Sequence, residues 1–346
     1  VKIIEIDSDI ITELHSIESL WKRFMREWQL AHHLAQQTGA DHLLLMTLNW
    51  FQIGLLLPAA HQVSYTISGI FFSPYPRWSP EPKTWRQHLS VFLKRFRKKA
   101  LMWLMMRNAN ISAVHVLNDP RAVDYLNRTI DNERNRFKAL PDPVPVLPAP
   151  QVGANLRMRY SVEQERTLFL FFGTISRRKG IFRVLDAFGK LPKRVQGKAA
   201  LLLLGRLKDG QQVDIREQVH MLREESDLQV RTDFRFLEPE ELALALQECD
   251  VVLAPYQRTE GSSGVIGHAA RAGKPVIGPQ SGLIGELIRD YELGKALDAT
   301  HVEEIAKGLI TFVEETECEP VSAHGRGEYV RERSPTLFVR TLLEVE

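Results

Sequence analysis

A loop rich in glycine and serine carries the residues best suited to chemistry. The segment RTEGSSGVIGHAARAGKPVIGP, residues 258–279, is typical of a turn, a short helix ended by glycine and a buried strand. Small residues at 262–264 begin that helix, where unpaired backbone N–H groups and the helix dipole favour a phosphate. Glu260 and His268 lie on either side of them. We therefore expect this loop to bind a phosphorylated ligand.

A basic turn supplies a second set of candidate contacts. In FLFFGTISRRKGIF, Arg178 and Lys179 stand between a buried strand and an amphipathic helix. A solvated basic turn is the simpler interpretation of such a cluster taken alone, but its place at the end of a strand favours a role in binding. Positive groups held there would stabilise the negative charge that a departing diphosphate gains, and a site of this kind works without a metal ion.

The second half of the chain contains the strands that must position these residues. Five apolar segments alternate with helical or turn segments, which predicts a parallel sheet covered on both faces. Ligands of such sheets bind at the carboxyl ends of the strands. The predicted strands are RTLFLFF, AALLLLGRL, LQVRTDFRFL, CDVVLAPY and KPVIGP.

The first half repeats this alternation. Its predicted strands are VKIIEI, DHLLLMTL, QVSYTISGIFF and ISAVHVL, and its predicted helices cover 17–37, 83–108 and a segment that opens at Pro120. The proline-rich LPDPVPVLPAP breaks the pattern and predicts a linker. We expect an α/β protein of two doubly wound parallel-sheet domains, residues 1–160 and 161–325, that face a cleft. Residues 326–346 are expected to form a helix packed back on the first domain.

Bulk properties restrict the class of protein. The chain has 346 residues, a net charge of +2 and two cysteines, Cys249 and Cys318, which form no metal-ligand or disulfide pattern. No apolar run reaches the roughly 18 residues of a membrane span, so we expect a cytoplasmic protein. The chain starts without methionine, on a strand that lacks a glycine-rich turn. We therefore expect residues to precede Val1.

Three motifs together resemble those of a known family. FFGTISRRKGI, CDVVLAPY and EGSSGVIGHAARAGKPVI are similar to the donor-domain motifs of retaining glycosyltransferases of family 4, the glycosyl transferases group 1 type, which have the GT-B fold. The resemblance covers residues 165–320. It implies that the protein transfers a hexose from a nucleotide sugar to a polysaccharide precursor or lipid-linked glycan. We expect the hexose to be glucose and the nucleotide to be UDP. It implies neither a cofactor nor a metal ion.

The resemblance also assigns roles to residues. It implies that Glu260 contacts hydroxyls of the transferred sugar, although a carboxylate there also caps the following helix. His268 replaces a glutamate that accepts hydrogen bonds from the ribose. A neutral imidazole has one acceptor nitrogen, so His268 either binds one hydroxyl or simply packs against the sheet. Thr174 replaces an arginine, whose charge would come from Arg177 or Arg178.

The candidate residues form two sets. The catalytic set is Glu260, Lys179 and Arg178. The donor-binding set lies at the strand ends and along the loop and comprises Gly173, Thr174, Gly205, Leu237, Tyr256, Gly261, Ser262, Ser263, Gly264, Val265 and His268.

Other features carry weaker assignments. The family's first-domain histidine has no match, because TISGIFF offers Ser68 and Gly69. The DSD at 7–9 is interpreted as loop acids before a helix and not as a metal site. Two further functions remain open: a non-catalytic relic that binds a nucleotide or glycan, and a nucleotide-sugar epimerase of the same architecture. Donor hydrolysis distinguishes the relic from an active transferase.

The predicted helix 83–108 is unusually basic. No acidic residue occurs from 82 to 118, and apolar residues are interleaved with the lysines and arginines. Such a helix suits an anionic membrane surface at the inner face of the cell membrane. The alternative is a core-packing helix with a solvated basic face. No recognition-helix motif accompanies it, so we expect no nucleic-acid partner.

Overall fold

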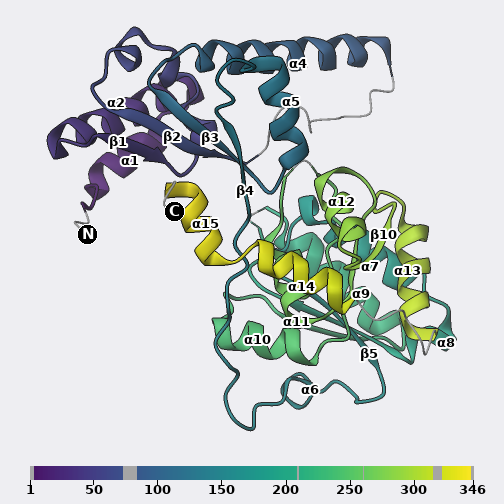
Figure 1. Cartoon of the computed structure of the whole chain (residues 1–346). Helices are drawn as coiled ribbons and strands as arrows, with labels where there is room; N and C mark the ends of the chain where they lie inside the picture. The colour runs from purple at the N-terminus through teal and green to yellow at the C-terminus, as the bar shows by residue number, and fades with distance from the viewer. Residues whose placement is uncertain (1–3, 73–83, 209, 260, 315–321, 344–346) are drawn as a thin grey trace. The chain divides into compact units, whose positions relative to one another are not determined.

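The computed structural model describes residues 4–72, 84–208, 210–259, 261–314 and 322–343 (Figure 1). The chain divides into two compact units, Val1–Leu140 and Pro141–Glu346. Each unit contains a parallel β-sheet with helices, which confirms the predicted α/β class of two parallel-sheet domains. None of the helices in the described ranges combines the length and apolar character needed to span a bilayer.

The first unit contains a four-stranded parallel sheet in the order β1-β2-β3-β4. Its strands are β1 (His42–Leu45), β2 (Thr66–Phe71), β3 (Ile111–Leu117) and β4 (Phe137–Leu140). Its helices are α1 (Ser8–Ser16), α2 (Leu20–Thr38), α3 (Leu48–Phe51), α4 (Trp85–Met106) and α5 (Pro120–Ile130), with 3-10 turns η1 (Gly54–Leu56) and η2 (Pro58–His61).

One strand predicted for this unit, VKIIEI, does not form in its described residues, while its first three residues lie outside the described part of the chain, and one observed strand was not predicted. Residues 4–6 form no strand, because Ile4 and Ile6 are exposed and no neighbouring strand satisfies the backbone there. Strand β4 was not predicted, since only its end residues Phe137 and Leu140 are buried. Its apolar residues form neither a continuous run nor a regular alternation with polar ones. Helix α2 does end as expected, at Gly39 in the left-handed conformation (φ 62°).

The second unit contains a six-stranded parallel sheet in the order β10-β9-β8-β5-β6-β7. The sheet is doubly wound, because the chain builds outward from β5 first in one direction and then in the other. Its strands are β5 (Thr167–Phe172), β6 (Ala199–Leu204), β7 (Gln229–Asp233), β8 (Val251–Leu253), β9 (Val276–Pro279) and β10 (Gly294–Leu297). The five predicted strands are confirmed, and β10 was not predicted.

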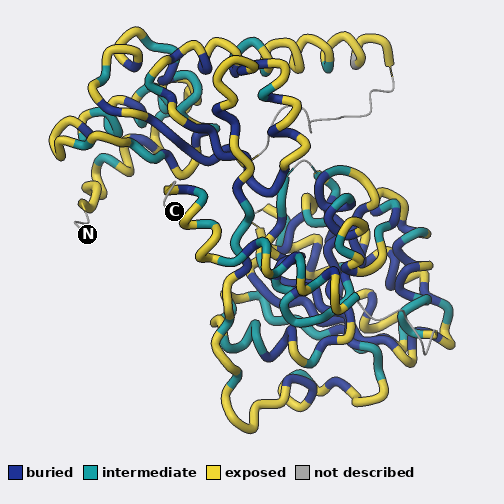
Figure 2. The backbone as a smooth tube through the Cα atoms, in the orientation of Figure 1, coloured by how far each residue is buried: buried dark blue, intermediate teal, exposed yellow. Residues whose placement is uncertain are grey.

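Helices cover both faces of this sheet, and side chains of β5 alternate between the two resulting cores. The residues of β5 and β6 are buried along almost the whole length of each strand (Figure 2). Leu168 and Leu170 pack with α10, α11 and α12, whereas Phe169 and Phe171 pack with α7, α9 and α13. The helices are α6 (Leu156–Arg159), α7 (Ile181–Gly189), α8 (Lys193–Gln196), α9 (Gln212–Glu225), α10 (Pro239–Glu248), α11 (Gly264–Ala272), α12 (Gly282–Asp290), α13 (Val302–Glu314), α14 (Ala323–Glu332) and α15 (Pro335–Leu343).

The segment after Leu140 belongs to the second unit. Val144 and Leu156, which lie in the range assigned from the sequence to the first domain, are buried in the core that contains Leu168. Tyr329 of α14 is buried in the same core. The proline-rich segment and the C-terminal region therefore both contribute packing to the sheet that carries the candidate site.

Candidate functional site

The carboxyl ends of β5 and β6 approach each other closely. Gly173 follows β5 with φ 85°, and Gly205 follows β6 with φ 129°. A Cβ added to Gly205 would lie 2.1 Å from the carbonyl oxygen of Gly173, a distance that no side chain tolerates. Gly205 therefore needs glycine for both conformation and space, whereas Gly173 needs it for its positive φ.

Lys179 places its amine at the end of β5. The Nζ donates a hydrogen bond of 3.3 Å to the carbonyl of Phe172 and lies 6.0 Å from the ring centroid of Tyr256. A Cβ on Gly173 would come within 2.9 Å of this Nζ, so the glycine leaves room for the amine. Burial, followed by the positive charge of Arg178, lowers the pKa of Lys179 to about 8.

The two neighbouring arginines point in different directions. The guanidinium of Arg178 lies 5.4 Å from the ring centroid of Tyr256, beside the Lys179 amine. The guanidinium of Arg177 lies 4.4 Å from the ring of Phe182, on α7. The structure therefore directs Arg178, and not Arg177, toward Tyr256, a choice that the sequence left open.

The turn that carries these residues is held against the loop after β8. This 3-10 turn, η4 (Arg177–Lys179), ends at Gly180 with φ 88°. A Cβ on Gly180 would lie 2.1 Å from the carbonyl oxygen of Pro255, and the N–H of Gln257 donates to the carbonyl of Arg178 at 2.9 Å. Backbone contacts thus fix the basic turn beside Tyr256.

Helix α11 begins at the same place. The Tyr256 hydroxyl is 2.6 Å from Oγ of Ser263, which caps α11 by accepting from the N–H of Val265. The Ser262 hydroxyl donates to the Asp142 carboxylate at 2.7 Å. Because both serine hydroxyls bond within the protein, phosphate binding here would depend on backbone N–H groups and the helix dipole.

Asp142 is a contact that sequence reasoning missed. Burial raises the pKa of its carboxyl, while the Ser262 hydroxyl and the charge of Arg333 act in the opposite direction. The only feature of the sequence that could have indicated this contact is that Asp142 is the single acidic residue in the proline-rich segment LPDPVPVLPAP. Asp142 therefore ties this segment to the glycine- and serine-rich loop.

His268 lies on α11, half-buried against the end of β5. Its ring packs edge-to-face on Phe172 with centroids 6.1 Å apart, and its Nδ1 is buried without a hydrogen-bond partner among the described residues. Burial, and then the charge of Arg271, lower the pKa of the ring. The neutral ring thus packs on the sheet and also keeps an unpaired nitrogen, which is compatible with both roles considered from the sequence.

Replacing His268 with alanine tests the ribose contact. We expect the variant to bind UDP about fivefold to tenfold more weakly, because this loss of affinity corresponds to the free energy of one neutral hydrogen bond. Because the pKa of His268 is lowered, the wild-type affinity should stay constant through neutral pH and fall only below the usual histidine value of ~6.5, as the ring gains a proton. His268→Glu should remove that decline. Calorimetry provides the check, and an unchanged affinity in a folded His268→Ala variant would assign the ring to packing alone.

The remaining candidates are more scattered. Thr174 is exposed, and Leu237 is partly buried against the core that contains Leu168. Gly261 and Gly264 flank the two serines, and Val265 is buried. Glu260 lies outside the described residues, so its role stays a prediction. Within the described part of the chain, no group of three or more His, Cys, Asp or Glu side chains could hold a metal ion.

In the first unit, Ser68 and Gly69 lie inside β2. The Ser68 hydroxyl is 2.8 Å from Nε2 of His42, whose Nδ1 is 2.7 Å from the hydroxyl of Thr66. Gly69 accommodates the carbonyl of Leu45 on the neighbouring strand, 2.7 Å from where a Cβ would stand. These positions serve the sheet, and no catalytic role is assigned to them.

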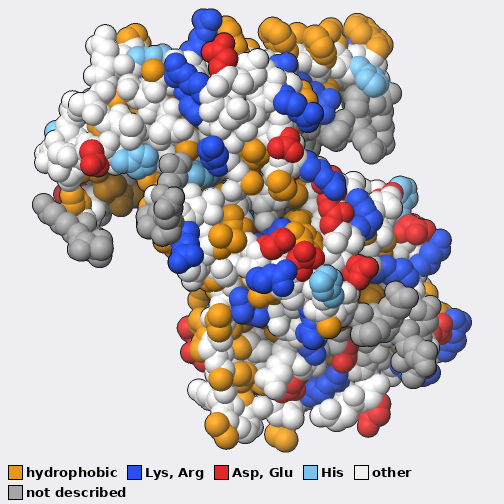
Figure 3. Space-filling view, viewed as in Figure 1, with side chains coloured by type: hydrophobic (Ala, Val, Ile, Leu, Met, Phe, Trp, Pro, Cys, Tyr) orange, Lys and Arg blue, Asp and Glu red, His pale blue; other side chains and the backbone are white. Residues whose placement is uncertain are grey.

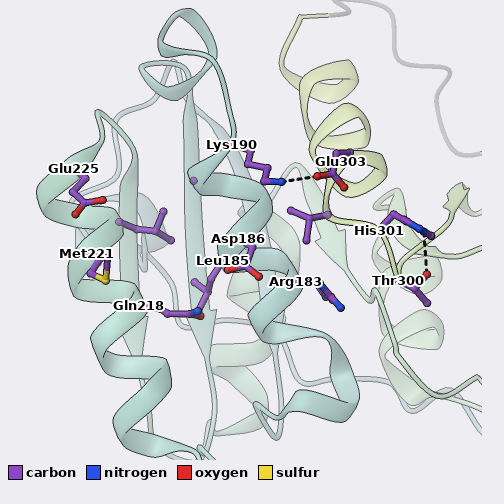
Figure 4. Close-up of a pocket in the computed structure, with 13 residues that line it drawn as sticks. Arg183, Leu185, Asp186, Lys190, Gln218, Met221, Glu225, Thr300, His301 and Glu303 are labelled. Carbon is purple, nitrogen blue, oxygen red and sulfur yellow. Dashed lines mark hydrogen bonds and ion pairs between the residues drawn. The ribbon is translucent and has the colours of Figure 1, made fainter.

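A pocket of about 740 Å³ lies elsewhere in the second unit, between α7, α9 and residues 300–303 (Figure 4). It is lined by polar side chains that include Arg183 and Gln218, and an ion pair of 2.5 Å joins Lys190 to Glu303 at its edge. None of the candidate site residues lines it. The chemistry is therefore expected at the strand ends and not in this pocket.

Comparisons with known proteins agree with this arrangement. A family model described as glycosyl transferases group 1 matches residues 155–331. No curated protein sequence gives a significant match.

Solved structures similar to this chain show its fold. An α,α-trehalose-phosphate synthase (UDP-forming) from Burkholderia xenovorans, in complex with glucose-6-phosphate, aligns with a TM-score of 0.69 at 15% identity, covering 93% of this chain and 78% of that one. Sucrose-phosphate synthase from Thermosynechococcus elongatus aligns with a TM-score of 0.65 at 20% identity, covering 95% and 77%. Anabaena HepE in complex with UDP-glucose aligns with a TM-score of 0.66 at 16% identity, covering 93% and 81%. The likeness is to GT-B glycosyltransferases and confirms that fold.

Proposed function

Because this chain belongs to the glycosyl transferases group 1 family, we propose that it transfers a hexose from a UDP-sugar to a polysaccharide precursor or a lipid-linked glycan. Glucose is the hexose that we propose first. The transfer is proposed to retain the anomeric configuration, as in family 4, and to need no metal ion. The observation that carries the proposal is the convergence of Lys179 and Arg178 on Tyr256, at the strand ends beside the start of α11.

The chemistry assigned to these residues follows from charge. When the bond between the anomeric carbon and the diphosphate oxygen breaks, the electron pair stays on the diphosphate. The acceptor hydroxyl forms the new bond to the anomeric carbon, and its proton passes to the departing diphosphate. Lys179 and Arg178 are fixed before the reaction, so they stabilise the growing negative charge without rearrangement. Glu260 is proposed to contact hydroxyls of the transferred sugar.

The lowered pKa of Lys179 supports this role. Burial and the positive charge of Arg178 lower the pKa of this amine to about 8, and among the described residues no anion, which would raise the value, contributes to the shift. A bound diphosphate would supply such an anion, raise the pKa of the amine and so keep it protonated. Lys179 is thus suited to an anionic ligand that arrives and leaves.

A hydrolysis assay without acceptor tests the function. We expect the protein to release UDP slowly from UDP-glucose, with EDTA leaving the rate unchanged. A thermal-shift screen over UDP-, GDP- and ADP-sugars should detect the donor, since a ligand at a hundredfold excess over its dissociation constant stabilises by about 2.7 kcal/mol. Failure of every nucleotide sugar to stabilise the protein would contradict the proposal.

The same assay separates the other two functions. A non-catalytic relic, which the Thr174 and His268 departures favour, would bind UDP-glucose and release no UDP. An epimerase would convert the sugar while the nucleotide stays attached. Retention is checked separately, by the anomeric configuration of the glycoside formed once an acceptor is supplied.

A further inference from the structure

Helix α4 has two apolar faces, and within the described part of the chain only one of them is buried against the protein. Met102, Met105 and Met106 are buried in the core of the first unit. A second set of apolar residues recurs at intervals of three, four or seven positions and lies about a third to a half of a turn around the helix from the buried methionines. We call it the exposed stripe: Trp85, Leu89, Phe92, Phe96 and Trp103.

The exposed stripe is open to solvent to an unusual degree. Trp85 is 70% exposed, Phe92 64% and Phe96 65%, and Leu89 beside them is 50% exposed. Figure 3 shows hydrophobic side chains gathered along α4 at the top of the view. Scattered exposed apolar residues are ordinary on protein surfaces, but a contiguous aromatic patch on one helix face marks a contact surface.

Basic residues border the exposed stripe on both sides. On a helical wheel Arg86 and Arg97 fall on one side of it, and Arg95 and Lys99 on the other. Asp and Glu are absent from residues 82–118. The helix therefore offers an apolar centre with positive edges, and a partner that fits it has an apolar layer beneath negative groups.

We propose that α4 docks on an anionic membrane surface, with the exposed stripe at the level of the headgroups and upper acyl chains and the basic residues on lipid phosphates. A bilayer with anionic lipids has the layered chemistry that this face requires. A second copy of the chain fits less well, because pairing through α4 brings two sets of basic residues together. A nucleic acid would favour a basic stripe, whereas here the centre of the face is apolar.

Co-sedimentation with vesicles tests this proposal on the full chain. The wild-type protein should sediment with phosphatidylcholine vesicles that contain phosphatidylglycerol, should stay in solution with phosphatidylcholine alone, and should be released as salt rises. Phe92→Ser with Phe96→Ser should lower partitioning at least about tenfold, because both rings are exposed in the free protein and contribute by entering the interface.

The basic edges are tested in the same assay. Arg97→Gln with Lys99→Gln, one residue from each edge of the exposed stripe, should lower partitioning by about thirtyfold, since each basic side chain near an anionic surface contributes roughly fivefold. The matched controls are Met158→Ser with Val213→Ser, which remove exposed apolar side chains elsewhere, and Arg183→Gln with Lys193→Gln, which remove the same charge. Both controls should bind vesicles like the wild type.

Three results would overturn the proposal. The first is equal partitioning of the wild type and the Phe92/Phe96 variant. The second is that the wild-type protein binds both vesicle types equally or binds neither. The third is evidence for another partner, either a dimer in sedimentation equilibrium that the Phe92/Phe96 variant abolishes or full competition between a labelled oligonucleotide and the vesicles. The assay measures partitioning alone, so its outcome is independent of whether the protein transfers a sugar.

Discussion

Replacing Lys179 with methionine should lower the turnover of UDP-glucose by about a hundredfold to a thousandfold. Removal of one fixed group that stabilises developing negative charge costs this much in other enzymes. The methionine keeps the length and apolar stem of the side chain, so the loss reports the charge. Steady-state release of UDP, with and without acceptor, is the measurement.

Arg177→Met is the matched control. It removes a positive charge from the same turn, but the Arg177 guanidinium stacks on Phe182 and points away from Tyr256. We expect turnover within about twofold of the wild type, in line with an exposed substitution. Equal losses in both variants would show that the turn contributes only general positive charge, and the specific role of Lys179 would be rejected.

The Lys179→Met variant should also be more stable than the wild type near pH 7. The pKa of this amine is about 8 in the fold, against the ordinary 10.5 in the unfolded chain, so the fold disfavours its charged form. That cost is fully present below pH 8 and disappears as pH rises to about 10.5, which makes wild-type stability increase across this window. Methionine should add roughly 1–3 kcal/mol at pH 7 and remove the pH dependence, as measured by urea unfolding.

Binding should show the opposite pH dependence. A diphosphate prefers the protonated amine, and above pH 8 the free protein has lost that proton. Wild-type affinity for UDP is therefore expected to fall as pH rises beyond 8, with proton uptake on binding that calorimetry in two buffers detects. A flat affinity between pH 7 and 9.5 would remove Lys179 from the diphosphate site.

Gly205→Ala should destabilise the second unit by about 3–5 kcal/mol. The φ of 129° is strained for any residue with a Cβ, and that Cβ would meet the Gly173 carbonyl oxygen at 2.1 Å. The ends of β5 and β6 must then separate, which also displaces the site. Urea unfolding measures the stability, and a thermal shift with UDP measures the site.

Gly197→Ala provides the comparison. Gly197 has helical φ and ψ of −65° and −12°, and nothing lies within 4 Å of an added Cβ. Alanine there should leave stability unchanged or raise it by up to about 1 kcal/mol, because the unfolded chain loses freedom. If the two variants unfold at the same urea concentration, the contact between Gly205 and Gly173 has no energetic importance.

The amino-acid sequence determined the elements in which one local pattern dominates. The five apolar strands of the second half and the end of α2 at Gly39 follow from runs of buried residues and from a backbone conformation that glycine adopts freely. The same local reasoning placed Lys179 and the GSSG loop at strand and helix ends. It failed at β4 and β10, whose few inward residues form no recognisable period.

Tertiary structure alone decided how the candidate residues meet. The sequence could not choose between Arg177 and Arg178, because the choice depends on which aromatic ring, Phe182 or Tyr256, lies beside each guanidinium after the chain folds. Nor could it pair Asp142 with Ser262, since 120 residues separate them and the contact forms only when the proline-rich segment packs with the second unit. Such contacts are set by strand order and helix packing, which bring distant segments together and leave no trace in local spacing.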